Sequence, residues 1–461
     1  MIPLPRRISP SEILNNIHKS IEQMLFFNQP PSNRPRDPSM FFHGCSGSED
    51  VDGTPPERSV SRAATDARAS IEDALSLDGP PDVRVAVGDR VYQYHAGSGY
   101  FGLQSHPEVL AATCEATLRY GVGTATSRAA FTSPPVFEVE RRIADLFGSA
   151  RAFYTSSGYI GNQILVDALC GTFDRVFIDE ASHHSLFDAA RNIRAARFRP
   201  IPFKHRCPED LQEKLDANLR WNERPLVLTD GLFSLVGSIA PVDRYVELLS
   251  EYEGASLLVD DAHGIGVLGR SGRGTLEHFG IDPATANRTR EDTIDPFGLA
   301  ETHPVNLYFS LSMSKAVGGY GGVIPGSDTF IERLMERSKV FTGASAPPSP
   351  IAAATAKGLA VLFDDSQLRD RLRERSRYLK SRLREDGFAP GDSPVPIVNL
   401  TLGSALNMRR VQKGLSERGF LIAYLPRHPG LGSEGTLRIA VFATHTNEMI
   451  DSLVEALHDI A

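Results

Sequence analysis

The sequence predicts an α/β fold, in which a large domain is built on a mostly parallel sheet and a smaller α+β domain closes the chain. Between about residues 83 and 345, short apolar segments typical of strands alternate with segments of helical periodicity. After about residue 350, two long helical patterns precede further strands and a last helix. The predicted units are an N-terminal arm over 1–82, a large domain over 83–345 and a small domain over 346–461.

The N-terminal arm is predicted to contain a helix, a linker and a second helix. Apolar residues recur at helical spacing over 11–27, after Pro10 and Ser11, which are typical of a helix start. The segment 28–56 is rich in Pro, Ser, Gly and Asp and is typical of a linker or a disordered segment. A helical pattern returns over 59–77.

The large domain begins with two segments that alternate as strands do, and helices and strands then follow in turn. The predicted strands cover 83–87, 91–94, 150–155, 175–178, 198–202, 225–229, 256–259 and 306–311. The predicted helices cover 137–146, 159–169, 184–193, 208–219 and 244–252. An irregular insertion is expected over 281–305. In the small domain we expect helices over 352–363, 368–385 and 448–457 and strands near 397–401 and 435–442.

Composition limits the partners of the chain. Of its 461 residues, 41% are hydrophobic and 23% charged, with a formal net charge of −8, so no basic face suggests a nucleic acid. The four cysteines lie far apart and form no CxxC pair, which favours a reducing compartment. No apolar stretch approaches the length of a membrane span, and no apolar segment follows Arg6 and Arg7 as in a signal peptide. We therefore expect a cytoplasmic protein with no nucleic-acid partner.

A lysine follows the predicted strand 306–311. Lys315 comes after two hydroxyl residues, Ser312 and Ser314, and before the glycine-rich run 318–322. Glycines allow the backbone to approach a ligand closely, and hydroxyl groups at a strand end suit phosphate. A lysine that loses its proton through desolvation can form a Schiff base. The alternative interpretation is a lysine that points to solvent from a flexible turn.

Other strand ends carry further polar residues, and such ends are where open α/β sheets bind ligands. After strand 256–259, Asp260 could bind a protonated ring nitrogen and His263 a phenolic oxygen, although a metal site or a helix cap is also compatible with this spacing. After strand 150–155, Ser157 and Gly158 open a helix whose N-terminus could bind phosphate or could simply be capped. After strand 175–178, His183 could stack on an aromatic cofactor or cap a helix.

Each feature is weak alone, but their order along the chain matches the needs of pyridoxal 5′-phosphate (PLP). A phosphate cradle, a histidine, an Asp-x-x-His pair and a lysine followed by glycines each come at the end of a strand. They provide the phosphate grip, ring stacking, ring-nitrogen and ring-oxygen contacts, and Schiff base that PLP requires.

The chain resembles the α-oxoamine synthases, the PLP-dependent transferases of fold type I that include 8-amino-7-oxononanoate synthase, 5-aminolevulinate synthase, 2-amino-3-ketobutyrate ligase and serine palmitoyltransferase. The matching motifs run from about Tyr100 to the C-terminus, and they lie at 100–107, 182–185, 230–234, 259–266 and 314–319. The resemblance implies the aspartate aminotransferase-like fold and a homodimer with its active site at the subunit interface.

The resemblance also implies a role for each matching residue. Lys315 is expected to be the Schiff-base lysine and to move the α-proton, Asp260 to pair with the ring nitrogen, and His263 with the ring oxygen. His183 is expected to stack on the ring and to help orient the acyl thioester. Arg438 is expected to hold the amino-acid carboxylate. The remaining cofactor contacts implied at the phosphate or ring are Ser157, Gly158, Tyr159 and Ser312, with Ser234 nearby.

The implied reaction is a decarboxylative condensation. An α-amino acid reacts with an acyl thioester, delivered by coenzyme A or an acyl-carrier protein, to give an α-aminoketone, carbon dioxide and the free thiol. No metal is expected. The alternatives are another fold-type-I enzyme, such as an aminotransferase or an aldolase, and an inactive cofactor-binding subunit of a heteromeric synthase.

Three departures from the family pattern stand out. The Asn that usually precedes the Tyr-Leu-Gly turn is missing from 96–99, where Ser98 is the nearest polar substitute. Ala344 stands where the family usually provides a Thr to the phosphate of the neighbouring subunit, which leaves Thr342 or Ser345 as candidates. The insertion 281–305 and the arm exceed the compact bacterial pattern. The departures predict a specialised member of the family.

Overall fold

The computed structural model describes residues 75–193, 199–289, 292, 304–426 and 430–461. Of these, Ser76–Ala461 form one unit of structure. The predicted arm helix over 11–27 and the linker over 28–56 lie outside the described residues. Most of the predicted helix over 59–77 does so too, and its described end, 75–77, is not helical.

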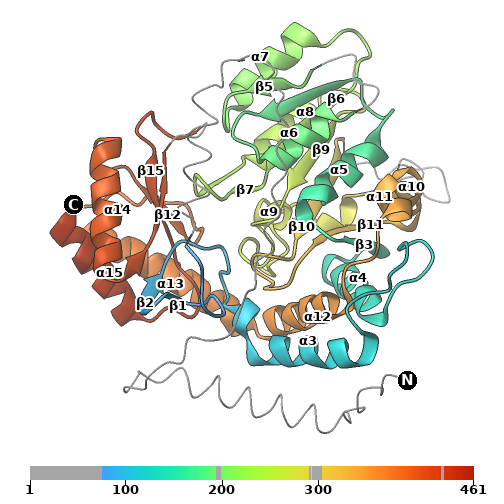
Figure 1. Ribbon diagram of the computed structural model, residues 1–461. Helices are drawn as coiled ribbons and strands as arrows, with labels where there is room; N and C mark the ends of the chain where they lie inside the picture. Colours follow the sequence, from blue (N-terminus) through green and yellow to red (C-terminus); the bar gives the residue numbers. More distant parts are fainter. Residues whose placement is uncertain (1–74, 194–198, 290–291, 293–303, 427–429) are drawn as a thin grey trace, which may run out of the picture. The chain divides into compact units, whose positions relative to one another are not determined.

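A seven-stranded sheet lies at the centre of the large domain, with helices on both of its faces (Figure 1). All neighbouring strands are parallel except for the pairs that involve β11, which confirms the predicted mostly parallel sheet. Its strands, in spatial order, are β3 (Arg151–Thr155), β11 (Gly322–Gly326), β10 (Asn306–Ser312), β9 (Ser256–Asp260), β6 (Pro225–Asp230), β4 (Arg175–Asp179) and β5 (Ile201–Phe203).

Strand β11 was not predicted, and its sequence explains why. Its five residues read Gly-Val-Ile-Pro-Gly, which lacks the alternation and the β-branched run of a typical strand. The strand is nevertheless fully buried, because it inserts antiparallel between β3 and β10. Its pairing therefore comes from the neighbouring strands rather than from local propensity.

The helices of the large domain follow the predicted pattern, with additions. The predicted helices appear as α4 (Pro134–Phe147), α5 (Gly158–Leu169), α6 (His184–Arg191), α7 (Pro208–Asn218) and α8 (Val242–Leu249). Helices that the pattern did not predict are α3 (Pro107–Tyr120), α9 (Thr275–His278), α10 (Asp328–Arg337) and α11 (Lys339–Gly343). The short strands β7 (Leu232–Phe233) and β8 (Ser238–Ile239) form a hairpin after β6.

The central strands are apolar on both faces, which is why they read as continuous hydrophobic runs. Along β6, Val227 packs into one buried cluster, whereas Leu226 and Leu228 pack into the cluster on the other face. Burying a side chain of this size contributes about 1.5–3 kcal/mol. The two cores hold the sheet rigidly and thereby set the positions of the loops at its ends.

The insertion after α9 begins in an ordered way. A 3-10 turn over Pro283–Thr285 leads to Asn287, whose side chain donates to the carbonyls of Phe309 and Pro325 and accepts the N–H of Phe309. These three bonds tie the start of the insertion to β10 and β11. Apart from the 3-10 turn, the segment 281–289 contains no helix or strand, as expected for an irregular insertion. Most of 290–303 lies outside the described residues.

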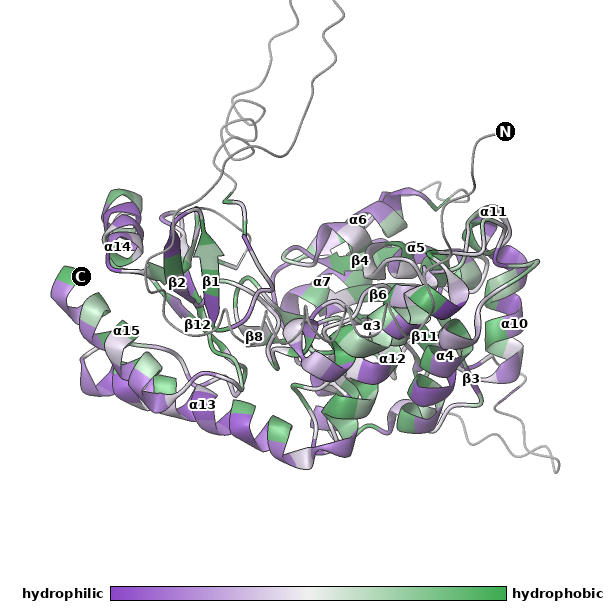
Figure 2. Ribbon diagram, turned by 60° about the horizontal axis from the view of Figure 1, so that its bottom comes forward, coloured by the Kyte–Doolittle hydropathy of each residue, from purple (hydrophilic) through white to green (hydrophobic). Residues whose placement is uncertain are grey.

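The C-terminal part contains a second sheet with helices against it. The antiparallel strands are β12 (Ile397–Leu400), β15 (Thr436–Ala440) and β14 (Ala423–Leu425). Helices α13 (Ser366–Glu385), α14 (Ala405–Glu417) and α15 (Asn447–Ile460) share a buried cluster with this sheet, and α14 was not predicted. Helix α12 (Ser349–Asp364) instead packs on α3 and α4 of the large domain. Helix α13 is largely hydrophilic, and its buried leucines, Leu368, Leu372, Leu379 and Leu383, lie at helical spacing (Figure 2).

Two early strands pair with the C-terminal part. Strands β1 (Arg84–Val87) and β2 (Arg90–Tyr94) form a sheet with β13 (Phe420–Leu421). The hydrogen bonds between β2 and β13 connect residues on the two sides of position 346. The division of the chain at residues 83 and 346 stays a prediction. None of the described helices has the length and apolar character that a membrane crossing requires.

Candidate active site

Polar residues from four neighbouring strands meet at one edge of the central sheet. Strands β4, β6 and β9 end at Asp179, Asp230 and Asp260, and Lys315 comes three residues after the end of β10. Asp230 lies directly opposite Asp260 in the parallel pairing of β6 and β9. Because parallel strands present the same end at the same edge, these side chains share one site.

Asp260 is the most firmly held of these carboxylates. It is 8% exposed, and it accepts a hydrogen bond of 2.6 Å from Nδ2 of Asn162 and one of 3.0 Å from the backbone N–H of Ala262. Asn162 in turn accepts from the hydroxyl of Ser310 at 2.5 Å. No described lysine, arginine or histidine forms an ion pair with Asp260. The fold therefore holds the carboxylate of Asp260 in a fixed orientation, and no described basic side chain is paired with it.

Lys315 is half-buried beside these acids. Burial lowers the pKa of its ammonium group from the ordinary value, and the negative charge of Asp260 opposes this shift. No hydrogen bond or ion pair joins Nζ to another described residue. A lysine with these properties has a larger neutral fraction than an exposed one, as a nucleophilic amine requires.

His183 is held by its backbone, and its side chain is only partly buried. Its N–H donates to Oδ1 of Asp230 at 3.0 Å, and its Nδ1 lies 2.8 Å from Oγ of Ser185. Its ring contacts that of Tyr159 edge-on, at 5.8 Å between centroids. Burial lowers the pKa of the imidazole, Asp260 opposes that shift, and Lys315 adds to it. The ring thus has a fixed position and favours its neutral form.

His263 lies against a buried tyrosine. Its Nδ1 is 3.0 Å from the hydroxyl of Tyr100, and burial raises the pKa of this tyrosine to about 12. Burial also lowers the pKa of His263 well below its ordinary value, and the positive charges of Lys315 and Arg438 act in the same direction. Both side chains therefore stay neutral at physiological pH, and Tyr100 fixes the orientation of the histidine ring.

Arg438 comes to the site from β15, in the C-terminal part of the chain. It is 5% exposed, and its Nε donates to the carbonyl of Ser234 at 2.8 Å. One terminal nitrogen donates to the carbonyls of Ala96 at 3.0 Å and Gly97 at 3.4 Å. No carboxylate among the described residues pairs with this guanidinium. Ser98 follows these carbonyls in the chain and is partly exposed.

The start of α5 comes very close to the end of β10. Ser157 caps this helix and accepts the N–H of Tyr159 at 3.1 Å. A Cβ atom on Gly158 would lie 2.9 Å from Cβ of Ser312, so only glycine allows this approach. The hydroxyl of Ser312 lies 2.9 Å from that of Ser314. A helix N-terminus and two hydroxyls suit an anion such as phosphate.

The sequence analysis missed three residues of this site. Asn162 and Tyr100 contact the predicted Asp260 and His263, and Asp230 lies beside Asp260. Asn162 is the one polar residue among the buried residues of α5, and a polar residue between apolar core positions is the signal that could have identified it. Tyr100 and Asp230 lie within the motifs at 100–107 and 230–234, but nothing in their local pattern assigned them a contact.

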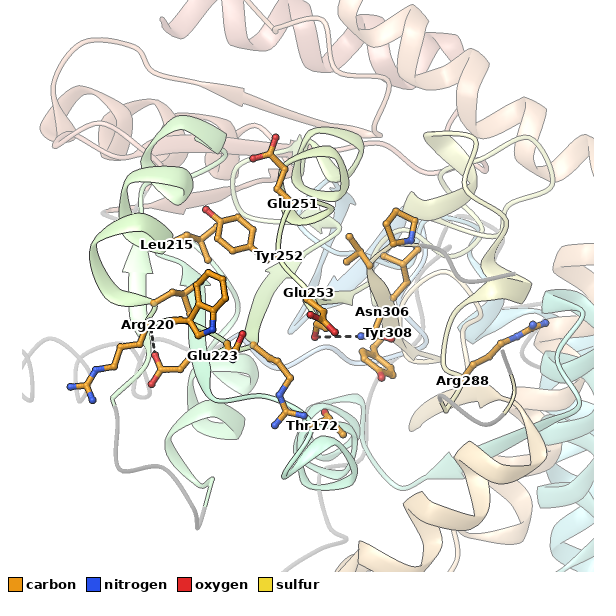
Figure 3. Close-up of a pocket in the computed structure, with 18 of the residues that line it drawn as sticks. Thr172, Leu215, Arg220, Glu223, Glu251, Tyr252, Glu253, Arg288, Asn306 and Tyr308 are labelled. Atoms are coloured by element: carbon orange, nitrogen blue, oxygen red, sulfur yellow. Dashed lines mark hydrogen bonds between the residues drawn. The ribbon is translucent and has the colours of Figure 1, made fainter. Parts of the chain in front are cut away.

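The opposite edge of the sheet carries a large cavity that lacks this chemistry. The cavity has a volume of about 1420 Å³ and lies at the amino ends of β6, β9 and β10 (Figure 3). Its lining is polar and mixed in charge, and includes Arg220, Trp221, Glu223, Tyr252, Glu253, Arg288 and Tyr308. None of the sequence-predicted site residues lines it.

Comparison with known proteins adds to this geometry. The model of the family described as aminotransferase class I and II matches residues 97–457. An 8-amino-7-oxononanoate synthase from Methylococcus capsulatus is 34% identical over 384 residues, which are 83% of this chain and 92% of that protein.

Two solved structures share the fold. A serine palmitoyltransferase from S. paucimobilis with a bound PLP–myriocin aldimine has a TM-score of 0.75 at 24% identity, and the match covers 87% of this chain and 96% of that one. An 8-amino-7-oxononanoate synthase from Francisella tularensis has a TM-score of 0.63 at 22% identity, with coverages of 79% and 96%. These likenesses confirm the predicted fold class.

Proposed function

The chain belongs to the α-oxoamine synthases, within the aminotransferase class I and II family, and we propose that it performs their condensation at the site around Lys315. The reaction joins an α-amino acid to an acyl group from a thioester, with loss of carbon dioxide and release of the thiol. The observation that carries this assignment is the half-buried Lys315, with its lowered pKa, beside the unpaired carboxylate of Asp260.

PLP is the cofactor of this enzyme class, and the residues present fit it. Asp260 forms no ion pair with a described basic residue and so suits a protonated ring nitrogen, which needs a buried anion. The close approach of Gly158 to Ser312 brings the N-terminus of α5 beside the hydroxyls of Ser312 and Ser314, an arrangement that suits a phosphate. Neutral His263 suits the ring oxygen, and the exposed ring of His183 suits the ring face. The further contacts that we propose are Ser157, Tyr159 and Ser234.

When bound, PLP supplies an electron-withdrawing ring that accepts negative charge from the α-carbon of the amino acid. Asp260 keeps the proton on the ring nitrogen, and Asn162 holds this carboxylate in place. Nζ of Lys315 takes the α-proton and later returns one to the product. The low pKa of Lys315 makes the neutral amine available for this task.

Arg438 and His183 position the two substrates. We assign Arg438 to the amino-acid carboxylate, because it is a buried guanidinium that no described carboxylate pairs with. Ser98 follows the two carbonyls that fix Arg438, and we assign it to the same carboxylate. We assign neutral His183 to the acyl thioester, because its imidazole can donate a hydrogen bond to the thioester carbonyl.

The relatives suggest a first pair of substrates. The name 8-amino-7-oxononanoate describes a nine-carbon acid with an amino group on carbon 8 and a carbonyl at carbon 7. Alanine that has lost its carboxyl group accounts for carbons 8 and 9, and a seven-carbon dicarboxylic acyl group accounts for the rest. We therefore propose alanine and the thioester of this diacid as the pair to test first.

The test is a thiol-release assay on the purified PLP-loaded enzyme. Alanine, glycine and serine are each combined with acyl thioesters of several lengths, on coenzyme A and on acyl-carrier protein, and the products are identified by mass spectrometry. We expect thiol release that depends on one amino acid, together with carbon dioxide and an α-aminoketone. Amino transfer to a 2-oxo acid without any thiol release would contradict the proposal and favour an aminotransferase.

We also propose that the enzyme is a homodimer in the cytoplasm. Large apolar side chains are exposed close together in the chain, on the loop after α3 and in the first turn of α4, namely Val122, Phe131 and Phe137. A second copy that covers them would remove this apolar surface from water. The described cysteines Cys114, Cys170 and Cys207 are free thiols, in keeping with a reducing compartment. Sedimentation of the wild type and of Phe131→Asp tests the dimer, which the aspartate should weaken.

A further inference from the structure

Three buried carboxyl groups lie side by side at the edge of the sheet that carries the site. Asp260 ends β9, Asp230 ends β6 and Asp179 ends β4, and these three strands are neighbours. Asp230 is the middle one, in direct register with Asp260. Each is at least nine-tenths buried, with exposed fractions of 8%, 9% and 0%. Three adjacent buried charges repel one another and need compensation.

The surrounding groups compensate two of these carboxyl groups but not the third. Asp179 accepts the backbone N–H groups of Ala181 and Arg206 at 2.9 Å, and its Oδ1 lies 3.0 Å from Nδ1 of His205. Asp260 has Asn162 and the N–H of Ala262, and it faces the proposed ring nitrogen.

Among the described residues, the carboxyl group of Asp230 has a single hydrogen-bond donor. It accepts only the N–H of His183, at 3.0 Å, and no lysine or arginine that the structure describes forms an ion pair with it. A buried carboxylate with one neutral donor and two acidic neighbours is far less stable than the corresponding acid. Consistently, burial raises the pKa of Asp230 well above its ordinary value, and the charge of Asp260 raises it further.

We propose that Asp230 is a protonated, neutral carboxyl group at physiological pH and acts as a positioning residue for the proposed cofactor site. In this form it accepts the His183 N–H and so fixes the residue assigned to the ring face. It also places a neutral group, rather than a second negative charge, beside Asp260. Asp260 thereby remains the one carboxylate assigned to the ring nitrogen. The inference deepens the proposed function, because its second effect concerns the same cofactor.

The charge state of Asp230 has a consequence for stability that needs no cofactor. The titratable groups that face it are Asp260 on β9, Asp179 on β4, His183 after β4 and Lys315 after β10. A carboxyl whose pKa is raised in the folded state binds its proton more tightly when folded than when unfolded. Its contribution to stability is complete below the pKa of an unfolded aspartate and is lost as the pH rises through the raised value.

The test compares Asp230→Asn with Asp230→Leu. Asparagine imitates the neutral acid and keeps an oxygen for the His183 N–H, whereas leucine removes this acceptor. We expect Asp230→Asn to retain PLP affinity within about twofold and Asp230→Leu to weaken it about tenfold or more. In the cofactor-free protein, the melting temperature of Asp230→Asn should increase relative to that of the wild type as the pH rises from 6 to 9.

Asp210 provides the matched control. It is another buried aspartate, but it accepts the N–H of Lys204 at 2.8 Å and lies 3.5 Å from the ammonium group of the same residue. Asp210→Asn should lower the melting temperature at pH 7 and show no comparable gain at higher pH. This control separates the protonation of Asp230 from the general effect of replacing a buried aspartate with asparagine.

A spectroscopic measurement covers the case in which the variants fail to fold. The wild type with ¹³C-labelled aspartate should show one carboxyl resonance of the protonated type at pH 8, where Asp261, with its pKa raised by burial to about 6, is already ionised. Only ionised aspartates at pH 8, or a weakening of PLP affinity by Asp230→Asn of about tenfold or more, would overturn the inference. A failure of the condensation assay would leave the resonance and the pH dependence of stability unchanged, so the two proposals can fail separately.

Discussion

The two edges of the central sheet both carry polar residues, but they use them differently. At the amino edge, charged side chains pair with one another, as in the contact of 2.9 Å between Arg224 and Asp174 and that of 3.1 Å between Arg175 and Glu223. At the carboxyl edge, Asp260 and Arg438 are buried and have no protein counter-ion among the described residues. A large cavity lies at the first edge, and the candidate active site lies at the second.

The comparison teaches that unsatisfied charge identifies a reactive site better than open volume does. The charges of such ion pairs are satisfied within the protein and leave none for a ligand. A buried charge without a partner is costly, and proteins retain such groups where a ligand provides the missing partner. The predictions below test this difference between the two edges, from the largest expected effect to the smallest.

Removing the lysine of the carboxyl edge should abolish turnover. Lys315→Ala loses the amine that moves the α-proton, so we expect kcat to fall at least about a thousandfold while the circular dichroism spectrum stays native. At the amino edge, Arg288→Ala removes an exposed cation that lines the cavity and should leave kcat within about twofold. Normal turnover by Lys315→Ala would refute the assigned mechanism.

Neutralising a carboxylate should also matter at one edge only. Asp260→Asn keeps the shape of the side chain but cannot hold the proton on the ring nitrogen, and we expect a loss in kcat of about a hundredfold or more. Glu223→Gln, in the ion pair with Arg175, is the control at the amino edge and should change kcat by no more than about twofold. Equal effects of the two substitutions would remove the distinction between the edges.

Changing the geometry of the cation at position 438 should raise KM for the amino acid more than KM for the thioester. Arg438→Lys retains the charge but loses the planar fork, so we expect KM for the amino acid to rise about ten- to a hundredfold. KM for the thioester should change much less. A rise in the thioester KM alone would assign Arg438 to the acyl group instead. Arg224→Lys, at the amino edge, should alter neither constant.

The smallest effect is expected at an exposed aromatic residue of the cavity. Trp221 is 91% exposed and is the only tryptophan in the sequence. Trp221→Ala should leave the free energy of unfolding within about 0.5 kcal/mol of the wild type and the condensation rate unchanged. A large loss of activity would show that the amino-edge cavity takes part in the reaction.

Much of this site was predictable, because its polar residues lie at the ends of successive predicted strands. Asp260 comes directly after an apolar run, and Lys315 closely follows another before a glycine-rich turn. Contacts between distant segments were not predictable in this way. His263 and Tyr100 are 163 residues apart, and Arg438 reaches Ala96 across 342 residues. No local pattern encodes such pairs, because they form only when separate elements pack together.

By itself, the sequence determined the alternation of strands and helices, the polar residues at the strand ends and the resemblance to the α-oxoamine synthases. These depend on local spacing and residue type, which the chain carries wherever it folds. Only the tertiary structure decided that β11 inserts between β3 and β10, that Asn162 holds Asp260, and that Asp230 lies in register with Asp260. The physical reason is that burial and strand register set the partners and charge states of these groups, and both arise from packing between elements.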